Sequence, residues 1–398
     1  MIELRWKNKY INYTNLTWSG THNQVSRIVS FEIPCNPYDK EFDNANIKLG
    51  DLIYLYDGKK QLFIGTVTKR DKTAEIGVAT YEATDFMKHL LRSNGSYSFK
   101  NKTAEKITKT LCKKVGISTK SLAKTKVKIK KLIFEEKSIY DMILDAYRTA
   151  KATTGKVYMP VMNGNKLSVI EKGLDCGVTL TQGVSIINAT YSDTTDNMVN
   201  RVVIYNDDNK KVGTVQNKKN VEKYGVFQET YSQEDGKDAK KEAKALLLGI
   251  TKEASVEAIG NIDAVSGKSL KITDKSTGLT GFFYIISDSH TFENGVHTMT
   301  LGLEWKNVME GEEEAQKEEK KKKKGANGGV VKTPVTNSTK CYYLSNSTVY
   351  HATTSCSACK GKKNFKTSTV AEMKKILVTK GKNKGKRKYK ACSKCWET

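Results

Sequence analysis

No stretch of this 398-residue sequence comes near the ~20 consecutive apolar residues that a membrane-spanning helix requires, so we expect no membrane span. The first ten residues, Met1–Tyr10, also lack the apolar core of a signal peptide. We therefore expect the chain to be made and folded in a cytoplasm. A short-period repeat is missing too, which argues against a solenoid.

Sequence motifs of catalysis are also missing. The chain contains no His-Glu-x-x-His, no Gly-x-Ser-x-Gly and no Gly-rich phosphate loop. The segment Ser287–His290 holds the residue types of a hydrolase triad, but neighbours along a strand point to different faces, so we interpret it as a polar strand end. Cys35 has no protease signature around it and no obvious histidine partner. The 43 acidic residues single out no carboxylate pair, and we predict that the protein is not an enzyme.

The chain does have an excess of positive charge, with 68 Lys and Arg against 43 Asp and Glu and a formal net charge of +25. This charge is unevenly placed, because residues 340–398 contain 15 basic and 2 acidic residues, whereas residues 1–309 account for only +11. Residues 310–324 hold six Glu and six Lys, which cancel. Over half of the excess therefore lies in a small C-terminal part of the chain.

Part of that charge lies in Lys380–Lys390, a basic run that we expect on a hairpin. Such a run can bind an anionic polymer, such as nucleic acid or teichoic acid, or lipid headgroups, or it can be a solvated surface. The sequence leaves these alternatives open. It shows no recognition-helix pattern and few aromatic residues that could stack on bases, so nucleic acid is not the expected partner.

The strongest chemical signal is a pair of Cys-x-x-Cys motifs, formed by Cys356 with Cys359 and by Cys392 with Cys395. In a reducing compartment such pairs favour a metal site over disulfides, and four thiolates suit a tetrahedral Zn²⁺. His351 is a competing ligand, so the site consists either of the four cysteines or of His351 with three of them. A site whose four positions are all filled by the protein is structural rather than catalytic.

The C-terminal module would need this metal in order to fold. It has few large apolar side chains, and a structural zinc contributes roughly 10–16 kcal/mol in zinc-finger peptides. We interpret its other cysteine, Cys341, as a spare thiol rather than as a fifth ligand. The remaining cysteines, Cys35, Cys112 and Cys176, are scattered singly.

The sequence predicts a mainly β chain with an α+β insert. Two β-rich blocks, residues 1–92 and 176–309, each have the size of a small barrel or sandwich. They flank an α/β domain at residues 93–175. A charged and Gly-rich linker follows at residues 310–335, and a zinc-binding module occupies residues 336–398.

Local signals support this division. Two strands are expected at residues 51–56 and 61–68 around the turn at Asp57-Gly58, and another follows the hairpin signal Asn294-Gly295. Further strands are expected at residues 202–205 and 281–286. Apolar stripes predict helices at residues 104–115 after Thr103, at residues 139–150 after Ser138, and at residues 239–250.

Residues 1–309 resemble the XkdQ/YqbQ family of PBSX-type prophage proteins, which are related in fold to the baseplate hub of contractile phage tails. No single segment is diagnostic, and the resemblance rests on the order and spacing of several. These segments are Gly50–Tyr56, Leu62–Val67, Tyr97–Glu105, Lys137–Ile143, Asn200–Tyr205, Lys223–Gln228 and Gly281–His290. The C-terminal module is similar to small zinc-binding modules with a Tyr-His…Cys…Cys-x-x-Cys pattern that are appended to varied proteins.

The family resemblance implies a structural role. It implies two tube-like β-barrel domains flanking the α/β domain, and a homotrimer that adapts a sixfold inner tube to a threefold spike, with the zinc module at the distal tip. The implied partners are the inner tube or a tube-initiator protein, a spike or tip protein, a LysM-type baseplate protein and the tape measure. The implied location is the host cytoplasm during assembly and then the baseplate of a virion or of a phage-tail-like bacteriocin, an extracellular particle.

Two other functions stay open at the level of sequence. One is a tail-associated peptidoglycan hydrolase delivered to the target cell wall, because some related hubs carry such domains, although this chain shows no hydrolase motif. The other is a nucleic-acid-binding zinc protein, whose affinity would fall steeply with salt.

Overall fold

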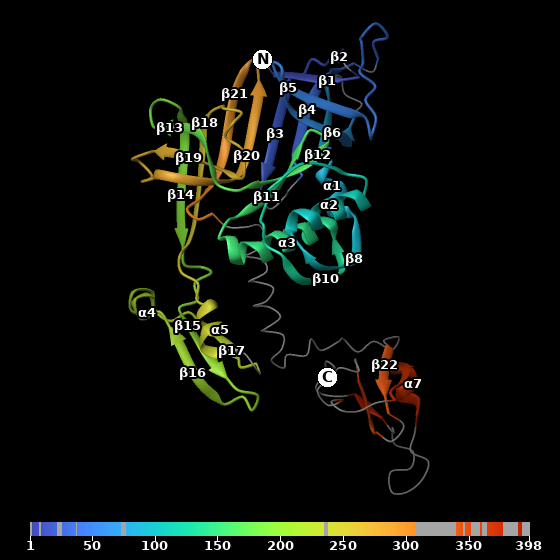
Figure 1. The fold of residues 1–398 in the computed structure, drawn as a ribbon, viewed down its shortest axis with the longest axis vertical. Coiled ribbons are helices and arrows are strands. Elements are labelled where there is room, and N and C mark those ends of the chain that lie inside the picture. Colours follow the sequence, from blue (N-terminus) through green and yellow to red (C-terminus); the bar gives the residue numbers. More distant parts are fainter. Residues whose placement is uncertain are drawn as a thin grey trace. The chain divides into compact units, whose positions relative to one another are not determined.

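The computed structural model describes residues 2–7, 9–21, 26–36, 38–72, 77–234, 238–307, 340–344, 347–351, 359, 364–376 and 389–391 (Figure 1). The chain divides into two compact units, Met1–Asn197 with Ile250–Glu314, and Met198–Gly249 with Ala315–Thr398. Within the described ranges, no helix is both long enough and apolar enough to cross a membrane.

One 13-stranded sheet makes up most of the first unit. The strands are β1 (Ile2–Trp6), β2 (Lys9–Tyr10), β3 (Asn15–Thr21), β4 (Ile28–Cys35), β5 (Leu52–Asp57), β6 (Lys60–Asp71), β7 (Gly77–Asp85), β13 (Leu174–Thr181), β14 (Ile186–Thr194), β18 (Thr251–Ile259), β19 (Lys268–Thr273), β20 (Thr280–Glu293) and β21 (Val296–Glu304). Their order is β14-β18-β21-β20-β3-β4-β7-β6-β5-β1-β2, while β13 pairs with β19, which pairs with β20.

Alternation of buried and exposed residues explains why these segments are strands. In β3 every second residue is buried, and β4 follows the same pattern until it reaches Pro34. The predicted hairpin at Asn294-Gly295 is confirmed, since it joins β20 to β21. Both turn residues have positive φ, +50° and +77°, which is the conformation that two-residue hairpin turns require.

The two β blocks are joined in this one sheet. Each block has its own core, one around Leu16, Phe31 and Tyr81 and the other around Leu270 and Leu301. The expectation of a mainly β chain is confirmed, but the described strands form no closed barrel. The strand β20 spans the junction of the two blocks, because Thr280–Tyr284 pair with β19 and Ser287–Glu293 pair with β3.

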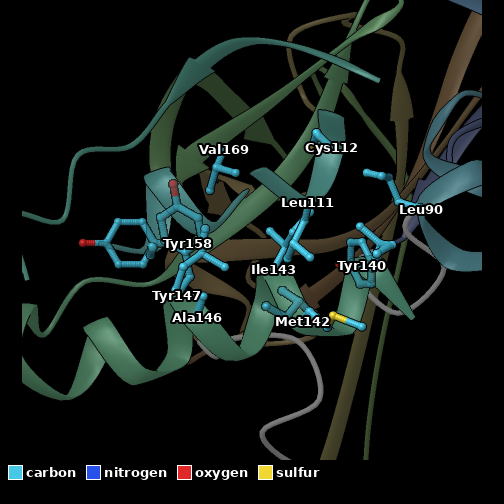
Figure 2. Packing of buried hydrophobic residues seen from close by; sticks show 14 of the residues in the cluster. Leu90, Leu111, Cys112, Tyr140, Met142, Ile143, Ala146, Tyr147, Tyr158 and Val169 are labelled. Carbon is cyan, nitrogen blue, oxygen red and sulfur yellow. The ribbon is translucent and has the colours of Figure 1, made fainter. Parts of the chain in front are cut away.

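The α/β insert lies between β7 and β13 in the chain. It comprises α1 (Met87–Arg92), β8 (Asn94–Lys102), α2 (Ala104–Lys114), β9 (Ser118–Leu122), β10 (Ile129–Ser138), α3 (Ile139–Thr154), β11 (Tyr158–Asn163) and β12 (Lys166–Glu171). The predicted start of α3 is confirmed, because the Ser138 hydroxyl accepts a hydrogen bond from the Asp141 amide, 3.0 Å away. Figure 2 shows Ile143 of α3 beside Leu111 of α2, and Tyr147 of α3 beside Tyr158, in a shared apolar core.

A small subdomain, Met198–Gly249, is inserted between β14 and β18. It contains β15 (Arg201–Tyr205), β16 (Lys211–Gln216), α4 (Lys218–Tyr224), β17 (Gln228–Ser232) and α5 (Ala239–Ala245). Ala243 and Leu246 pack against Val202 and Ile204, as the apolar stripe predicts. The predicted helix is too long, however: α5 ends at Ala245 and Ile250 is 37% exposed.

The described part of the C-terminal module contains β22 (Lys340–Tyr343), β23 (Val349–His351), β24 (Lys366–Thr369), α7 (Val370–Lys375) and β25 (Lys390–Ala391). The strand order is β24-β22-β23-β25. Thr369 and Glu372 form a reciprocal capping box at the start of α7. The small apolar core of the module contains Cys341, Tyr350 and Met373.

Candidate functional site

The most unusual chemistry among the described residues lies where β3 meets β20, at the junction of the two β blocks. The carboxylate of Asp288 on β20 is fully buried and accepts two hydrogen bonds from Arg27, Nη1–Oδ1 at 3.0 Å and Nη2–Oδ2 at 2.5 Å. The amide of Ser266 donates a third bond to Oδ1, at 2.7 Å. This bidentate ion pair joins residues 261 positions apart in the chain, and it therefore ties one β block to the other.

The ion pair keeps Asp288 ionised. Burial by itself would raise the pKa of this carboxyl, but the charge and hydrogen bonds of Arg27, together with the neighbouring His290, outweigh burial and hold the pKa well below its usual range. The Arg27 guanidinium also lies over the Trp18 ring, 4.0 Å from its centroid, in a cation–π contact. Gly20 leaves room for it, since a Cβ at this position would lie 2.6 Å from Nη1 of Arg27.

Two histidines extend this polar cluster. Nδ1 of His290 lies 3.1 Å from Nε2 of His297 on β21, and Nε2 of His290 lies 3.5 Å from Oδ2 of Asp288. Burial and then the neighbouring His290 lower the pKa of His297 to about 4. Both rings are therefore packed as structural groups, and a Cβ at Gly260 would lie only 2.1 Å from the His297 ring.

The cluster explains the Ser287–His290 motif. Ser287 and Ser289 point to the opposite face of β20 from Asp288 and His290, so the predicted separation of these residue types is confirmed. The interpretation as a polar strand end is wrong, because the motif lies within a strand of 14 residues and Asp288 and His290 are buried together. No serine of this motif reaches the histidines, and the arrangement is an Asp–His–His structural network.

A second buried carboxyl, Asp85, holds the segment that leads into β4. It accepts hydrogen bonds from the Ser26 hydroxyl at 2.6 Å, from the Arg27 amide at 3.1 Å and from the Met87 amide at 3.0 Å. Burial raises its pKa to about 6, and the hydrogen bonds moderate this rise. Asp85, at the end of β7, thereby links this strand to α1 and to Arg27, which forms the ion pair between the two β blocks.

Cys35 lies beside a surface pocket of about 410 Å³ that is lined by residues of the paired strands β4 and β7 and by Asn44–Asn46. The described residues that line it include Pro34, Asn44, Lys72 and Tyr81. None of the described lining residues is a histidine or a carboxylate, so the pocket offers Cys35 no general base.

Of the five predicted zinc ligands, the structure describes two. His351 on β23 and Cys359 are both buried, with 4% and 3% exposure. Cys356, Cys392 and Cys395 lie outside the described residues, and no group of three or more metal-binding side chains is found within the ranges described.

Cys341 is buried in the small core of the C-terminal module. Burial raises its pKa to about 11, so the thiol is protonated near neutral pH. In β22, Cys341 and Tyr343 lie on one face of the strand. Tyr342 lies on the other face and pairs directly with His351. Cys341 and His351 therefore lie on opposite faces of this small sheet.

A family model described as YQBQ-like matches residues 16–304, which span both β blocks and the insert. The chain belongs to the YQBQ-like family. The resemblance inferred from the sequence is thereby confirmed. The match ends before the C-terminal module.

Two relatives of this YQBQ-like chain come from Bacillus subtilis strain 168. The uncharacterized protein YqbQ is 31% identical over 273 residues, which are 66% of this chain and 83% of YqbQ. The phage-like element PBSX protein XkdQ is 26% identical over 306 residues, 74% of this chain and 93% of XkdQ.

The fold matches that of a solved tail protein. The 43 kDa tail protein of prophage MuSo2 from Shewanella oneidensis superposes with a TM-score of 0.59 at 14% identity, over 76% of this chain and 98% of the tail protein. At this identity the likeness concerns the fold alone. By family the chain is YQBQ-like, and over most of its length its fold is that of the MuSo2 tail protein.

Proposed function

We propose that this chain is the structural baseplate hub of a contractile tail, from a phage or a phage-tail-like bacteriocin. The observation that carries the proposal is the single sheet in which β3 and β20 join two β blocks, in a chain whose relatives include a protein of a phage-like element. In this proposal each block acts as one tube-like domain. A trimer then presents six such domains to a sixfold tube and a threefold end to the spike.

The junction gives this role a physical basis. An adaptor between a tube and a spike must hold its two tube-facing blocks at a fixed angle. The β3–β20 ladder and the buried Arg27–Asp288 pair provide that rigidity, because neither block can rotate without breaking them. The partners in this proposal are an inner tube or tube-initiator protein, a spike or tip protein, a LysM-type baseplate protein and the tape measure.

The mass of the purified assembly tests the proposal. Native mass spectrometry of the full chain is expected to give a trimer, three times the 44.5 kDa of one chain. The same trimer should recover tube and spike proteins when it is purified from assembled tails. A stable monomer with no tail partner would contradict the hub, and release of muropeptides from peptidoglycan by the purified chain would favour a hydrolase instead.

We further propose that the C-terminal module binds one structural Zn²⁺ at the distal tip. His351 and Cys359 are buried, as ligands of a closed site should be. Ala391 of β25 pairs with Tyr350 of β23. In the sequence, Cys392 directly follows Ala391, and His351 directly follows Tyr350. This register supports a site that combines the first and second Cys-x-x-Cys motifs, with either four cysteines or His351 and three of them as ligands.

Metal analysis tests the zinc site. The full chain is expected to contain one zinc per chain, and Cys392→Ser is expected to lose the metal and the folded module together. Cys176→Ser is the matched control, because Cys176 lies in β13 of the first unit, and it should retain the zinc. A metal-free Cys392→Ser module with unchanged proteolytic resistance would contradict the structural role.

A further inference from the structure

The positive charge of the first unit is concentrated in one part of the α/β insert. Residues 93–131 contain twelve lysines and one acidic residue, Glu105, so their net charge of +11 equals that of residues 1–309 as a whole. All twelve lysines are exposed. None of them forms an ion pair with a carboxylate in the part of the chain that the structure describes.

The densest part is Lys124–Lys131, which we name the lysine run and which covers most of the connection from β9 to β10 and the start of β10. Five of its eight residues are lysines, and they are all exposed. Residues between these lysines anchor the run to the rest of the insert. The Thr125 hydroxyl, for example, donates a hydrogen bond to the Glu105 carboxylate at 2.9 Å. The only acidic residue of the region is thus used to anchor the run, and it leaves the lysine charges uncompensated.

The end of the lysine run carries an unfavourable pairing. Lys131 on β10 lies directly opposite Lys100 on β8, and the next pair on this face contains Ile133, which is 51% exposed. Like charges directly opposite each other destabilise an antiparallel pair. A negatively charged group bound over this face would remove that cost.

The last described residue before the linker, Asn307, is held near this region. The side-chain amide of Asn307 donates to the Lys172 carbonyl at 2.7 Å. Lys172 lies three residues beyond Val169, about 10 Å along an extended chain. The Val169 carbonyl in turn accepts a bond from the amide of Ala123, the residue before the lysine run, at 2.9 Å.

The segment that follows Asn307 is acidic. Four of its five residues Glu310–Glu314 are glutamates, and they begin three residues after Asn307, within about 10 Å of extended chain. The linker's own lysine cluster starts only at Lys320, at least six residues beyond these glutamates. The glutamates therefore come closest in sequence to the insert, and the lysines come later.

We propose that Glu310–Glu314 docks onto the lysine run of the same chain. The contact fixes the start of the linker against the α/β insert, so that the tether of the C-terminal module begins at a defined point. It is an electrostatic contact between exposed groups and is weakened by salt, because such pairs are screened over about 10 Å at 0.1 M ionic strength.

Zero-length carbodiimide cross-linking of the full chain tests this contact, because it joins only carboxylates and amines that touch. Cross-links are expected between Glu310–Glu314 and lysines of residues 100–131 at low salt, with much less at 1 M NaCl. The variant E310Q/E312Q/E313Q/E314Q should lose them. The control variant E253Q/E257Q, which changes two exposed glutamates of β18, should keep them.

A second measurement tests whether Glu310–Glu314 or an external polyanion covers the lysine run. If the glutamates cover the lysine run, a fluorescent oligothymidylate should bind the quadruple Gln variant about tenfold more tightly than the wild type, the combined effect of a few exposed ion pairs. Equal affinities would overturn the proposal. So would cross-links confined to Lys317–Lys324, or cross-links that join labelled to unlabelled chains in a mixed-isotope sample, because either result assigns the glutamates to another partner.

Discussion

At the scale of single residues, the Arg27–Asp288 pair has the largest effect on how the chain is arranged. A buried ion pair is weak evidence for net stability, because removing two charges from water costs about as much as their attraction returns. It is strong evidence for specificity, since breaking it leaves a buried charge without a partner. Only one relative placement of the two β blocks satisfies both the guanidinium and the carboxylate.

Asp288→Asn should destabilise the first unit. The substitution leaves the mostly buried Arg27 without its counter-charge, and the loss is expected to be roughly 3–5 kcal/mol, measured by chemical denaturation. Asp263→Asn is the matched control, because its ion pair with Lys60 also joins the two β blocks but is half exposed. The control should lose less than about 1 kcal/mol, and equal losses would contradict the assigned role of the junction.

His297 should make the first unit sensitive to acid. Its pKa is lowered to about 4 in the folded state, so between that value and its ordinary pKa the unfolded chain binds the proton and the folded chain does not. Stability is therefore lost as the pH falls through this window. His297→Gln should remove roughly 1–3 kcal/mol of that loss, after allowance for the partial exposure of the ring.

Denaturation of wild type and His297→Gln at pH 7 and at pH 4.5 measures this effect. Asp85 acts in the opposite direction over much of the same window, because its pKa is raised to about 6 and its carboxyl is protonated more readily in the folded chain. It is present in both proteins and cancels in the comparison. Parallel pH profiles would show that the His297 ring is not held neutral.

At the scale of elements, β20 decides the architecture of the first unit. It is long enough to pair with β21 along one edge and with both β19 and β3 along the other. The same sheet also tolerates an insertion, because Thr194 at the end of β14 pairs directly with Thr251 at the start of β18. The chain between them, residues 195–250, leaves and re-enters the sheet at adjacent points.

Replacing residues 195–250 by a two-residue Asn-Gly turn should therefore leave the first unit folded. The turn closes β14 and β18 into an ordinary hairpin, and the excised subdomain has its own core. Circular dichroism and thermal unfolding should show a soluble protein whose main transition is close to that of the full chain.

Replacing residues 93–138 in the same way should give an insoluble chain, because α2, β8 and β10 contribute to the core that surrounds α3. An unfolded β14–β18 hairpin variant would contradict this independence.

At the scale of the whole molecule, the excess positive charge is concentrated in two separate regions of the chain. The C-terminal residues 340–398 carry 15 basic and 2 acidic residues, and residues 93–131 carry the equivalent of the entire excess of the first 309. The rest of the chain is close to neutral. The basic composition thus belongs to two regions of the sequence, and the proposed role of the chain in a tail rests on its family and its sheet.

Features that depend on neighbours a few residues apart can be predicted from the sequence. The hairpin at Asn294-Gly295 and the cap of α3 at Ser138 follow from backbone preferences, which act locally. The sequence also determined the family, because the order of several segments is preserved. What the sequence overestimated was the length of α5, where the apolar stripe continues past the last helical residue.

The meeting of distant segments becomes visible in the folded chain alone. Nothing near Trp18 specifies that it pairs with His290, and nothing near Arg27 specifies Asp288, because these contacts depend on the path of more than 250 intervening residues. The buried Asp288 and His290 have a weak signal, their spacing of two within an apolar strand, but that spacing does not name their partners. The union of two β blocks in one sheet is therefore a property of the folded chain, set by long-range strand pairing and by one buried ion pair.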